Sequence, residues 1–410
     1  MFDNSYILIS MVSILVILSY TYSAISYRTK IPSVLMLILT GIVARVAFNK
    51  MGYEMPPMKT VVEFFGIVGL ILIVLEGALD LRIKRDKLWL ITRSFFSALI
   101  ILVASSLSVA YGLHLFYGEI SFYTCLVNAI PLAVISSAIA IPSVGQMKEQ
   151  KKEFIIYESI FSDILGILFF NAVVTNPTFT IHSATWLLAD FAIIIAVSLV
   201  VSILILIFID KTTINIKFFL LIAIMVLLYA FGKMVHLSSL LMILFFGLIL
   251  NNLDLWAKDR VKKFLNVDKL QHGIERFKLI TNESAFLIRT LFFFIFGFTV
   301  SLPLMFKPRI IITGAIIVAI IYFIRFLYLK FITRRNLFPE LFVAPRGLIT
   351  ILLFYSIPME LSIGAISEGV LFTVIILSSL IMMFGLMQSG EKIPEMEIYV
   401  GDKRVEEENS

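Results

Sequence analysis

One carboxylate in this chain stands where a charge is costly. Asp163 lies in the middle of the apolar run 157–170, which has the composition of a membrane helix. An ionisable side chain at membrane depth costs about 2.5–3.5 kcal/mol on insertion scales, so it usually faces a protein interior or a water-filled cavity. We therefore predict that Asp163 binds a proton or a monovalent cation, without a cofactor and without enzymatic chemistry.

The neighbours of Asp163 on a helix predict the rest of this ion site. At about 100° per residue, Ser159 and Gly166 share the face of Asp163 and offer a hydroxyl and open space. Ser162 directly precedes the carboxylate, and we include it with Ser159 in the predicted site. Glu158 is turned by roughly 140° from Asp163, so it cannot face the same cavity and needs a separate partner.

The composition predicts an all-α protein that crosses the membrane many times. Of 410 residues, 60% are hydrophobic and 15% charged, and many apolar stretches reach the length needed to span a bilayer, roughly 20 residues each. The net charge of +6 is explained by loops that fix orientation, so nucleic-acid binding is not predicted. We place about 13 helices near 6–25, 31–49, 61–81, 88–113, 121–145, 153–175, 184–209, 217–232, 236–252, 279–300, 309–330, 338–357 and 366–388.

Charges in the connections indicate the orientation. With the N-terminus outside, the inner connections hold many Lys and Arg side chains, as around 82–87 and 148–152, and the outer ones hold few. This asymmetry follows the positive-inside rule and predicts a cytoplasmic C-terminus in a cell membrane, such as a bacterial inner membrane. The membrane domain should cover 1–388, followed by a short cytoplasmic tail over 389–410. The basic, partly apolar connection 251–278 is expected to form an amphipathic helix on the cytoplasmic interface, in contact with membrane lipid. The alternative is a solvated linker that joins the two halves.

Two membrane segments contain breaks at corresponding places. Pro131 and Pro142 flank the sequence Ser136-Ser137-Ala138-Ile139 in the fifth predicted helix, and Pro345 precedes Arg346-Gly347 in the twelfth. Proline removes a backbone donor and interrupts the helical ladder, which frees backbone groups to bind ions. Discontinuous helices near the bilayer midplane are typical of transporters with inverted repeats. We predict repeats over helices 1–6 and 8–13, with helices 5 and 12 broken and crossing.

Several of these motifs resemble one family. The segment 158–163 resembles the Glu-Ser-Leu-Phe-Asn-Asp motif of the monovalent cation:proton antiporter superfamily, in its sodium/proton exchanger branch. Four further stretches are similar to that family in the right order, and together they cover almost the whole membrane part: 31–41, 75–81, 289–297 and 344–347.

The resemblance implies a function, a partner and a movement. It implies exchange of a monovalent cation, Na⁺ first, for H⁺ by competition at Asp163, and an ion pair between Glu158 and Arg346. It also implies a homodimer in which a core bundle slides against a scaffold, an elevator-like movement. The scaffold corresponds to about 6–81 and 217–300, and the core to about 88–175 and 309–388.

Departures from the family pattern leave the substrate open. Ala138-Ile139-Ala140 replaces the Thr-Asp-Pro of the exchanger branch, and Ser136 to Ala140 is closer to the glutathione-gated potassium efflux branch. Ser162 replaces the usual Asn, which leaves one acidic residue where electrogenic relatives have two and favours electroneutral one-for-one exchange. The alternatives are a K⁺/H⁺ antiporter or K⁺ efflux protein, and a non-transporting sensor with the same fold.

Four other charged residues could act within the membrane part. Arg289 and Arg325 lie in or near predicted helices and could compensate charge in the core, and Arg289 is a candidate for an electrostatic role. Glu76 and Asp80 are expected to form a local ion pair with nearby basic residues at 82–84.

Overall fold

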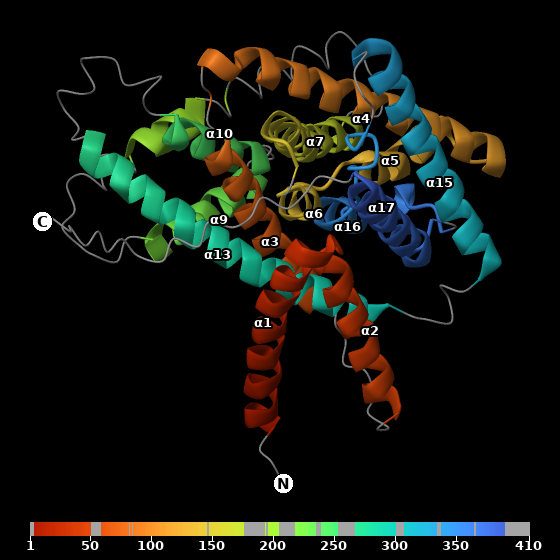
Figure 1. Cartoon of the computed structure of the whole chain (residues 1–410), viewed down its shortest axis with the longest axis horizontal. Coiled ribbons are helices and arrows are strands. Elements are labelled where there is room, and N and C mark those ends of the chain that lie inside the picture. Colours follow the sequence, from red (N-terminus) through yellow and green to blue (C-terminus); the bar gives the residue numbers. More distant parts are fainter. Residues whose placement is uncertain are drawn as a thin grey trace, which may run out of the picture.

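The computed structural model consists of helices throughout the residues it describes (Figure 1). These are residues 4–50, 59–175 apart from 82, 84 and 146, residue 193, and 196–204, 218–234, 239–252, 267–300, 307–333 and 338–389 apart from 365. Seven helical segments in this part are long and apolar enough to cross a membrane. The predicted all-helical membrane fold is therefore confirmed.

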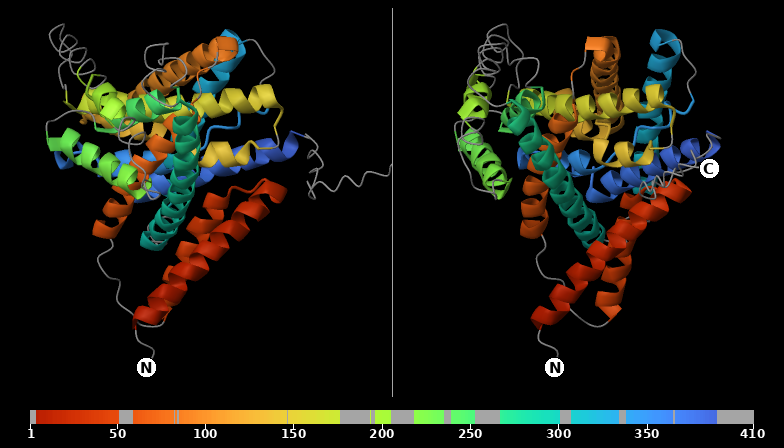
Figure 2. Two further views of the ribbon diagram at one scale, coloured as in Figure 1. Left: turned by 90° about the vertical axis from the view of Figure 1, so that its left-hand side faces the viewer. Right: turned by 60° about the vertical axis from the view of Figure 1, so that its left-hand side comes forward.

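The helices pack in two groups. The first helical group consists of α1 (Asn4–Thr29), α2 (Ser33–Lys50), α3 (Lys59–Asp80), α9 (Phe218–Met234), α10 (Ser239–Asn251) and α13 (Val267–Thr299). In this group α2 packs against α13, and one end of α1 and of α2 projects beyond the other helices (Figure 2). The second consists of α4 (Leu88–Tyr117), α5 (Phe122–Ala133), α6 (Ser137–Ser143), α7 (Glu149–Thr175), α15 (Pro308–Leu327), α16 (Leu348–Tyr355) and α17 (Glu368–Gln388).

Some predicted boundaries differ from the structure. The helix α13 begins at Val267, twelve residues before the predicted start at 279, so 267–278 are helical and continuous with the helix that follows. The place of this segment on the cytoplasmic interface stays a prediction. Of the predicted helix 184–209, residue 193 and residues 196–204 are described, and they are helical. The remainder of that helix, the first part of the linker at 253–266 and the tail from 390 lie outside the described residues.

Two glycines allow α2 and α13 to touch along their backbones. A Cβ added at Gly41 would lie 2.2 Å from the carbonyl oxygen of Phe294, and one added at Gly297 would lie 2.2 Å from that of Ile38. Small residues at such crossings permit the close backbone approach that drives helix association in membranes. The first helical group is therefore held by a contact that accommodates no side chain.

This contact generates a stability prediction. We expect Gly297→Ala to lower the free energy of unfolding in detergent by about 1–3 kcal/mol, because the added methyl group forces two backbones apart. Gly112→Ala in α4 is the matched control, since its Cβ would make only an ordinary contact, 3.4 Å from the Ile320 side chain. If both variants unfold like the parent protein, the α2–α13 contact is not tight.

Both predicted helix breaks are present. α5 ends at Ala133, three extended residues follow, and α6 begins at Ser137. The second break replaces much of the predicted helix 338–357, because 343–347 are extended and α16 begins only at Leu348. Pro345 explains this difference, since proline disfavours a helical conformation in the residue before it.

The two breaks cross each other. The backbone N–H of Ser136 donates to the carbonyl oxygen of Pro345 over 2.9 Å, which joins the interrupted segments directly. Each break thereby satisfies part of the hydrogen-bonding capacity that the other leaves open. Two broken, crossing helices are therefore present as predicted, while the inverted repeat remains a prediction.

Candidate ion-binding site

Asp163 projects from α7 toward the break between α5 and α6. Its side chain is buried, and Oδ2 accepts a hydrogen bond from the backbone N–H of Ser137 over 3.0 Å. That N–H belongs to the first residue of α6, where backbone donors lack intrahelical partners. Oδ1 is buried and has no hydrogen-bond partner in the part of the chain that the structure describes. One carboxylate oxygen is therefore anchored, and the other is available to a ligand.

A small cavity of about 10 Å³ adjoins this carboxylate. It lies where the two helical groups meet, and its volume is close to the minimum that holds one water molecule. Apart from Asp163 and Ser137, its lining side chains are apolar or absent: Ile73, Val74 and Gly77 from α3, Ile160 and Ile164 from α7, and Ile349 from α16. The carboxylate is therefore the charged group of this cavity.

The two serines predicted to belong to the site have other partners. Ser162 Oγ accepts a hydrogen bond from the backbone N–H of Ile135 over 2.9 Å, so it supports the helix break. Ser159 Oγ donates to the carbonyl oxygen of Ile156 in its own helix over 3.1 Å. Their role as ion ligands remains a prediction.

The predicted broken-helix residues Ser136, Ser137, Ala138 and Ile139 all lie at the crossing and are buried. Ser136 belongs to the break, and the other three form the first turn of α6. Gly166 of α7 lets the break approach closely, because a Cβ there would lie 2.4 Å from a methyl carbon of Val134. The break thus packs directly onto the helix that carries Asp163.

Arg346 lies at the other side of the same crossing. Its Nε donates to the carbonyl oxygen of Leu132 over 2.9 Å, its Nη1 donates to that of Ala344, and its side chain is buried. Leu132 is in the last turn of α5, where carbonyl groups lack intrahelical partners and a cation is favoured. Asp163 therefore meets the start of α6, and Arg346 meets the end of α5.

The predicted ion pair between Glu158 and Arg346 is wrong in its partner. Glu158 Oε2 instead accepts from Arg325 Nη2 of α15 over 2.7 Å, and both side chains are only 1% exposed. Ser97 Oγ of α4 donates to the other oxygen of Glu158 over 2.6 Å. The guanidinium of Arg346 instead donates to the carbonyl oxygens of Leu132, at the end of α5, and of Ala344. The pair thus joins α7 to α15 instead of to the second broken segment.

Arg325 carried a sequence signal of its own. It interrupts the apolar span Pro308–Leu327, just as Asp163 and Glu158 interrupt theirs. Intramembrane charges are usually paired with one another. Counting Arg325 beside Arg346 among the intramembrane charges would have made it a second candidate partner for Glu158.

The pair can be tested by a double-mutant cycle. We expect Glu158→Gln and Arg325→Met each to cost about 3–5 kcal/mol in unfolding free energy, because each leaves a buried charge unpaired. The double variant should lose clearly less than the sum, with a coupling of at least about 0.5 kcal/mol. Glu158→Gln combined with Arg346→Met is the control and should be closer to additive. Stronger coupling in the control would reinstate Arg346 as the partner.

Arg289 pairs with Glu76 within the first helical group. The guanidinium donates to both carboxylate oxygens of Glu76, over 2.9 and 3.2 Å, and links α13 to α3. Lys278, also from α13, lies 2.9 Å from Asp80. Glu76 and Asp80 therefore have partners on another helix. Arg82 and Lys84, the local partners that the sequence predicts, lie outside the described residues. The helical extension of α13 to 267 is what brings Lys278 opposite the end of α3.

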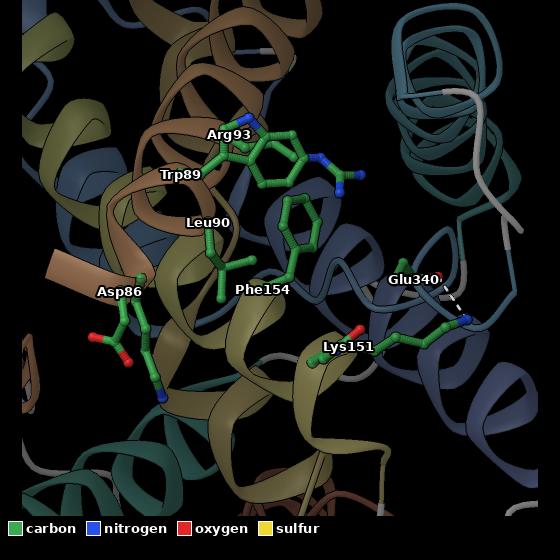
Figure 3. A pocket seen from close by; sticks show the side chains of 9 residues that line it. Asp86, Trp89, Leu90, Arg93, Lys151, Phe154 and Glu340 are labelled. Carbon is green, nitrogen blue, oxygen red and sulfur yellow. Dashed lines mark hydrogen bonds and ion pairs between the residues drawn. The ribbon is translucent and has the colours of Figure 1, made fainter. Parts of the chain in front are cut away.

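A larger pocket of about 480 Å³ lies at the N-terminal ends of α4 and α7 (Figure 3). The Arg93 guanidinium is held over the rings of Trp89 and Phe154, at 5.5 and 5.0 Å. Lys151 Nζ lies 3.2 Å from Glu340 Oε2 across the pocket. This pocket shares no lining residue with the cavity at Asp163, so it is a separate feature of the second helical group.

Comparison with known proteins decides the family. The family model described as "Sodium/hydrogen exchanger, transmembrane" matches residues 12–389. The chain belongs to this family. The predicted relationship to sodium/proton exchangers is thus confirmed over nearly the whole membrane part, and the family consists of transporters, not enzymes. No curated protein sequence matches the chain.

Two solved structures of one exchanger share its fold. The sodium proton antiporter MjNhaP1 from Methanocaldococcus jannaschii at pH 8 superposes with a TM-score of 0.66 at 17% identity, covering 94% of this chain and 99% of that one. An electron-microscopy map of the same antiporter gives a TM-score of 0.63 at 19% identity, covering 93% and 95%. At these identities the similarity establishes the exchanger fold, and the roles of individual residues must be argued from their geometry.

Proposed function

We propose that this exchanger is a secondary active antiporter that exchanges Na⁺ for H⁺ across a cell membrane, with Asp163 binding both ions in turn. The observation that carries the proposal is the buried Oδ1 of Asp163, which has no hydrogen-bond partner in the described part of the chain. A buried acceptor without a partner costs free energy, and either a proton or a cation would remove that cost. The carboxylate is thus suited to ligand exchange.

Competition at one carboxylate gives the coupling. Burial favours the neutral, protonated form, whereas a bound cation favours the ionised form, so each ligand expels the other. The backbone N–H of Ser137 holds Oδ2 in place in either state. In our proposal, the hydroxyl groups of Ser162 and Ser159 reorient to complete the cation shell when the cavity opens.

Movement of the second helical group against the first would expose the site alternately. Ile73 and Val74 of α3 face Ile160 and Ile164 of α7 around the small cavity, and apolar surfaces can slide without loss of ion pairs. The Glu76–Arg289 pair holds helices of the first group together, and the Glu158–Arg325 pair holds helices of the second. This division favours the proposed scaffold and core and an elevator-like movement.

A potassium/proton exchanger is the second candidate. Its support is the sequence from Ser136 to Ala140, in which Ala138 and Ala140 offer no side-chain ligand at the crossing. Fewer side-chain ligands favour a cation that loses its water more readily. Proton flux in proteoliposomes, measured against Na⁺ and K⁺ in turn, distinguishes the two substrates. For either substrate, we propose that the protein is a homodimer with its N-terminus outside the cell.

The central test is Asp163→Asn in proteoliposomes. The amide is nearly isosteric with the protonated acid, so we expect the fold to persist and cation-driven proton movement to fall to background. Cation-dependent thermal stabilisation should vanish as well, because a ligand that no longer binds the native state cannot shift its melting temperature. Asp80→Asn is the matched control, since Asp80 is the last residue of α3 and pairs with Lys278 away from the cavity. Residual exchange near the parent rate would move the ion site elsewhere.

The stoichiometry gives a second test. Asp163 is the buried carboxylate that lacks a basic partner in the described part, so we expect one cation to exchange for one proton. An imposed membrane potential should then leave the exchange rate nearly unchanged, as measured by the collapse of a pH gradient at fixed ion gradients. Protein-free liposomes, and liposomes that contain the Asp163→Asn variant, measure the passive proton leak. Clear acceleration by the potential above that leak requires a second proton-carrying group.

A further inference from the structure

A groove of about 370 Å³ runs along the second helical group between α4 and α15. It is away from Asp163, and its walls are almost wholly apolar. Gly112 contributes no side chain to the groove, and a Cβ there would lie 3.4 Å from the Ile320 side chain, at ordinary contact distance. The main lining side chains are Val109, Leu113 and Phe116 from α4, and Ile312, Ile316 and Ile320 from α15.

The length of the groove matches one leaflet of a bilayer. It extends along α15 from Arg309 to Ile320, eleven residues apart, or about 16 Å at 1.5 Å per residue. Half of a hydrocarbon core about 30 Å thick is nearly the same length. Ile312, Ile316 and Phe116 on its walls are more than half or about half exposed, so the groove opens on the outer surface of the protein. Such a space would accommodate an extended acyl chain.

One end of the groove carries positive charge. Arg309 lines it from the first turn of α15, and Lys307 lies just before that helix. The first turn of α15 contains no acidic residue, and Lys307 makes no side-chain capping hydrogen bond. A helix N-terminus already favours an anion, and two cations strengthen that preference.

We propose that this groove binds one phospholipid with a negatively charged headgroup. Its acyl chain lies between α4 and α15, and its phosphate contacts Arg309 and the first turn of α15. The proposal depends on neither the ion site nor the direction of transport. A membrane helix about 10–12 Å in diameter is too wide for a groove of this volume, so a second copy of the chain could cover the groove but not fill it.

The lipid would complete a part of the core that side chains leave open. Beyond the groove, Ser97 and Arg325 tie α4 and α15 to the same carboxylate, Glu158 of α7. Along the groove, contact between α4 and α15 is incomplete. A bound chain would join the two helices there, so that the lipid moves with the second helical group as part of it.

The test is thermal unfolding of the full-length, delipidated protein in detergent, titrated with phosphatidylglycerol or with phosphatidylcholine of the same acyl chains. We expect phosphatidylglycerol to raise the melting temperature more, with saturation. Arg309→Gln should weaken its apparent affinity about fivefold. Lys307→Gln is the charge-matched control and should have a smaller effect, because Lys307 does not line the groove.

A second variant tests the apolar part. Gly112→Leu should fill the groove, keep the fold and remove stabilisation by either lipid, whereas Leu115→Phe on the exposed face of α4 should retain it. Equal stabilisation by both lipids in the parent protein, or an undiminished effect in Gly112→Leu, would overturn the proposal. A lipid effect that appears only together with dimer formation would assign the surface to a second copy instead. Asp163→Asn should respond to lipid like the parent protein, which separates this inference from the proposed transport function.

Discussion

The cost of burying charge shapes the second helical group. Four charged side chains are buried in the described part of the chain: Glu158, Asp163, Arg325 and Arg346. Glu158 and Arg325 neutralise each other, with Ser97 as an added donor. Asp163 and Arg346 are stabilised by backbone groups at the ends of broken helices. A buried charge without such compensation would destabilise the fold. The helices that carry these four residues must therefore pack so that each charge meets its partner.

The helix breaks make this compensation possible. An unbroken helix would bond the N–H of Ser137 and the carbonyl of Leu132 internally, leaving neither for a side chain. Interrupting the ladder at 134–136 releases both groups, one toward Asp163 and one toward Arg346. The cost is limited because Ser162 and Pro345 bond the backbone of the break. The same interruption that weakens the helix therefore creates the charged ends of the site.

The place of Asp163 in an apolar run indicated that it is buried within the protein, and its role as the ion site stays a prediction. Sequence reasoning was right about the interrupted segments, which the prolines indicated. It failed for partners, because the partner of Glu158 depends on how helices far apart in sequence pack. Arg346 and Arg325 are equally plausible from sequence, and only the contact of Arg346 with the end of α5 decides between them. The continuity of 267–278 with the rest of α13 was not predicted, because the charged residues there indicate an interfacial segment separate from the span that follows.

The division of the charges between fixed pairs and the crossing has a functional consequence. Glu158 and Arg325 lie in the same helical group and bind each other there, so in the proposed exchange they hold that group together and bind no transported ion. In the described part of the chain, Asp163 has an N–H on one oxygen and no hydrogen-bond partner on the other, so its charge is incompletely compensated. In the proposed exchange, this leaves the carboxylate able to bind either a proton or a cation. A salt bridge at Asp163 would remove that property by stabilising the empty, ionised state.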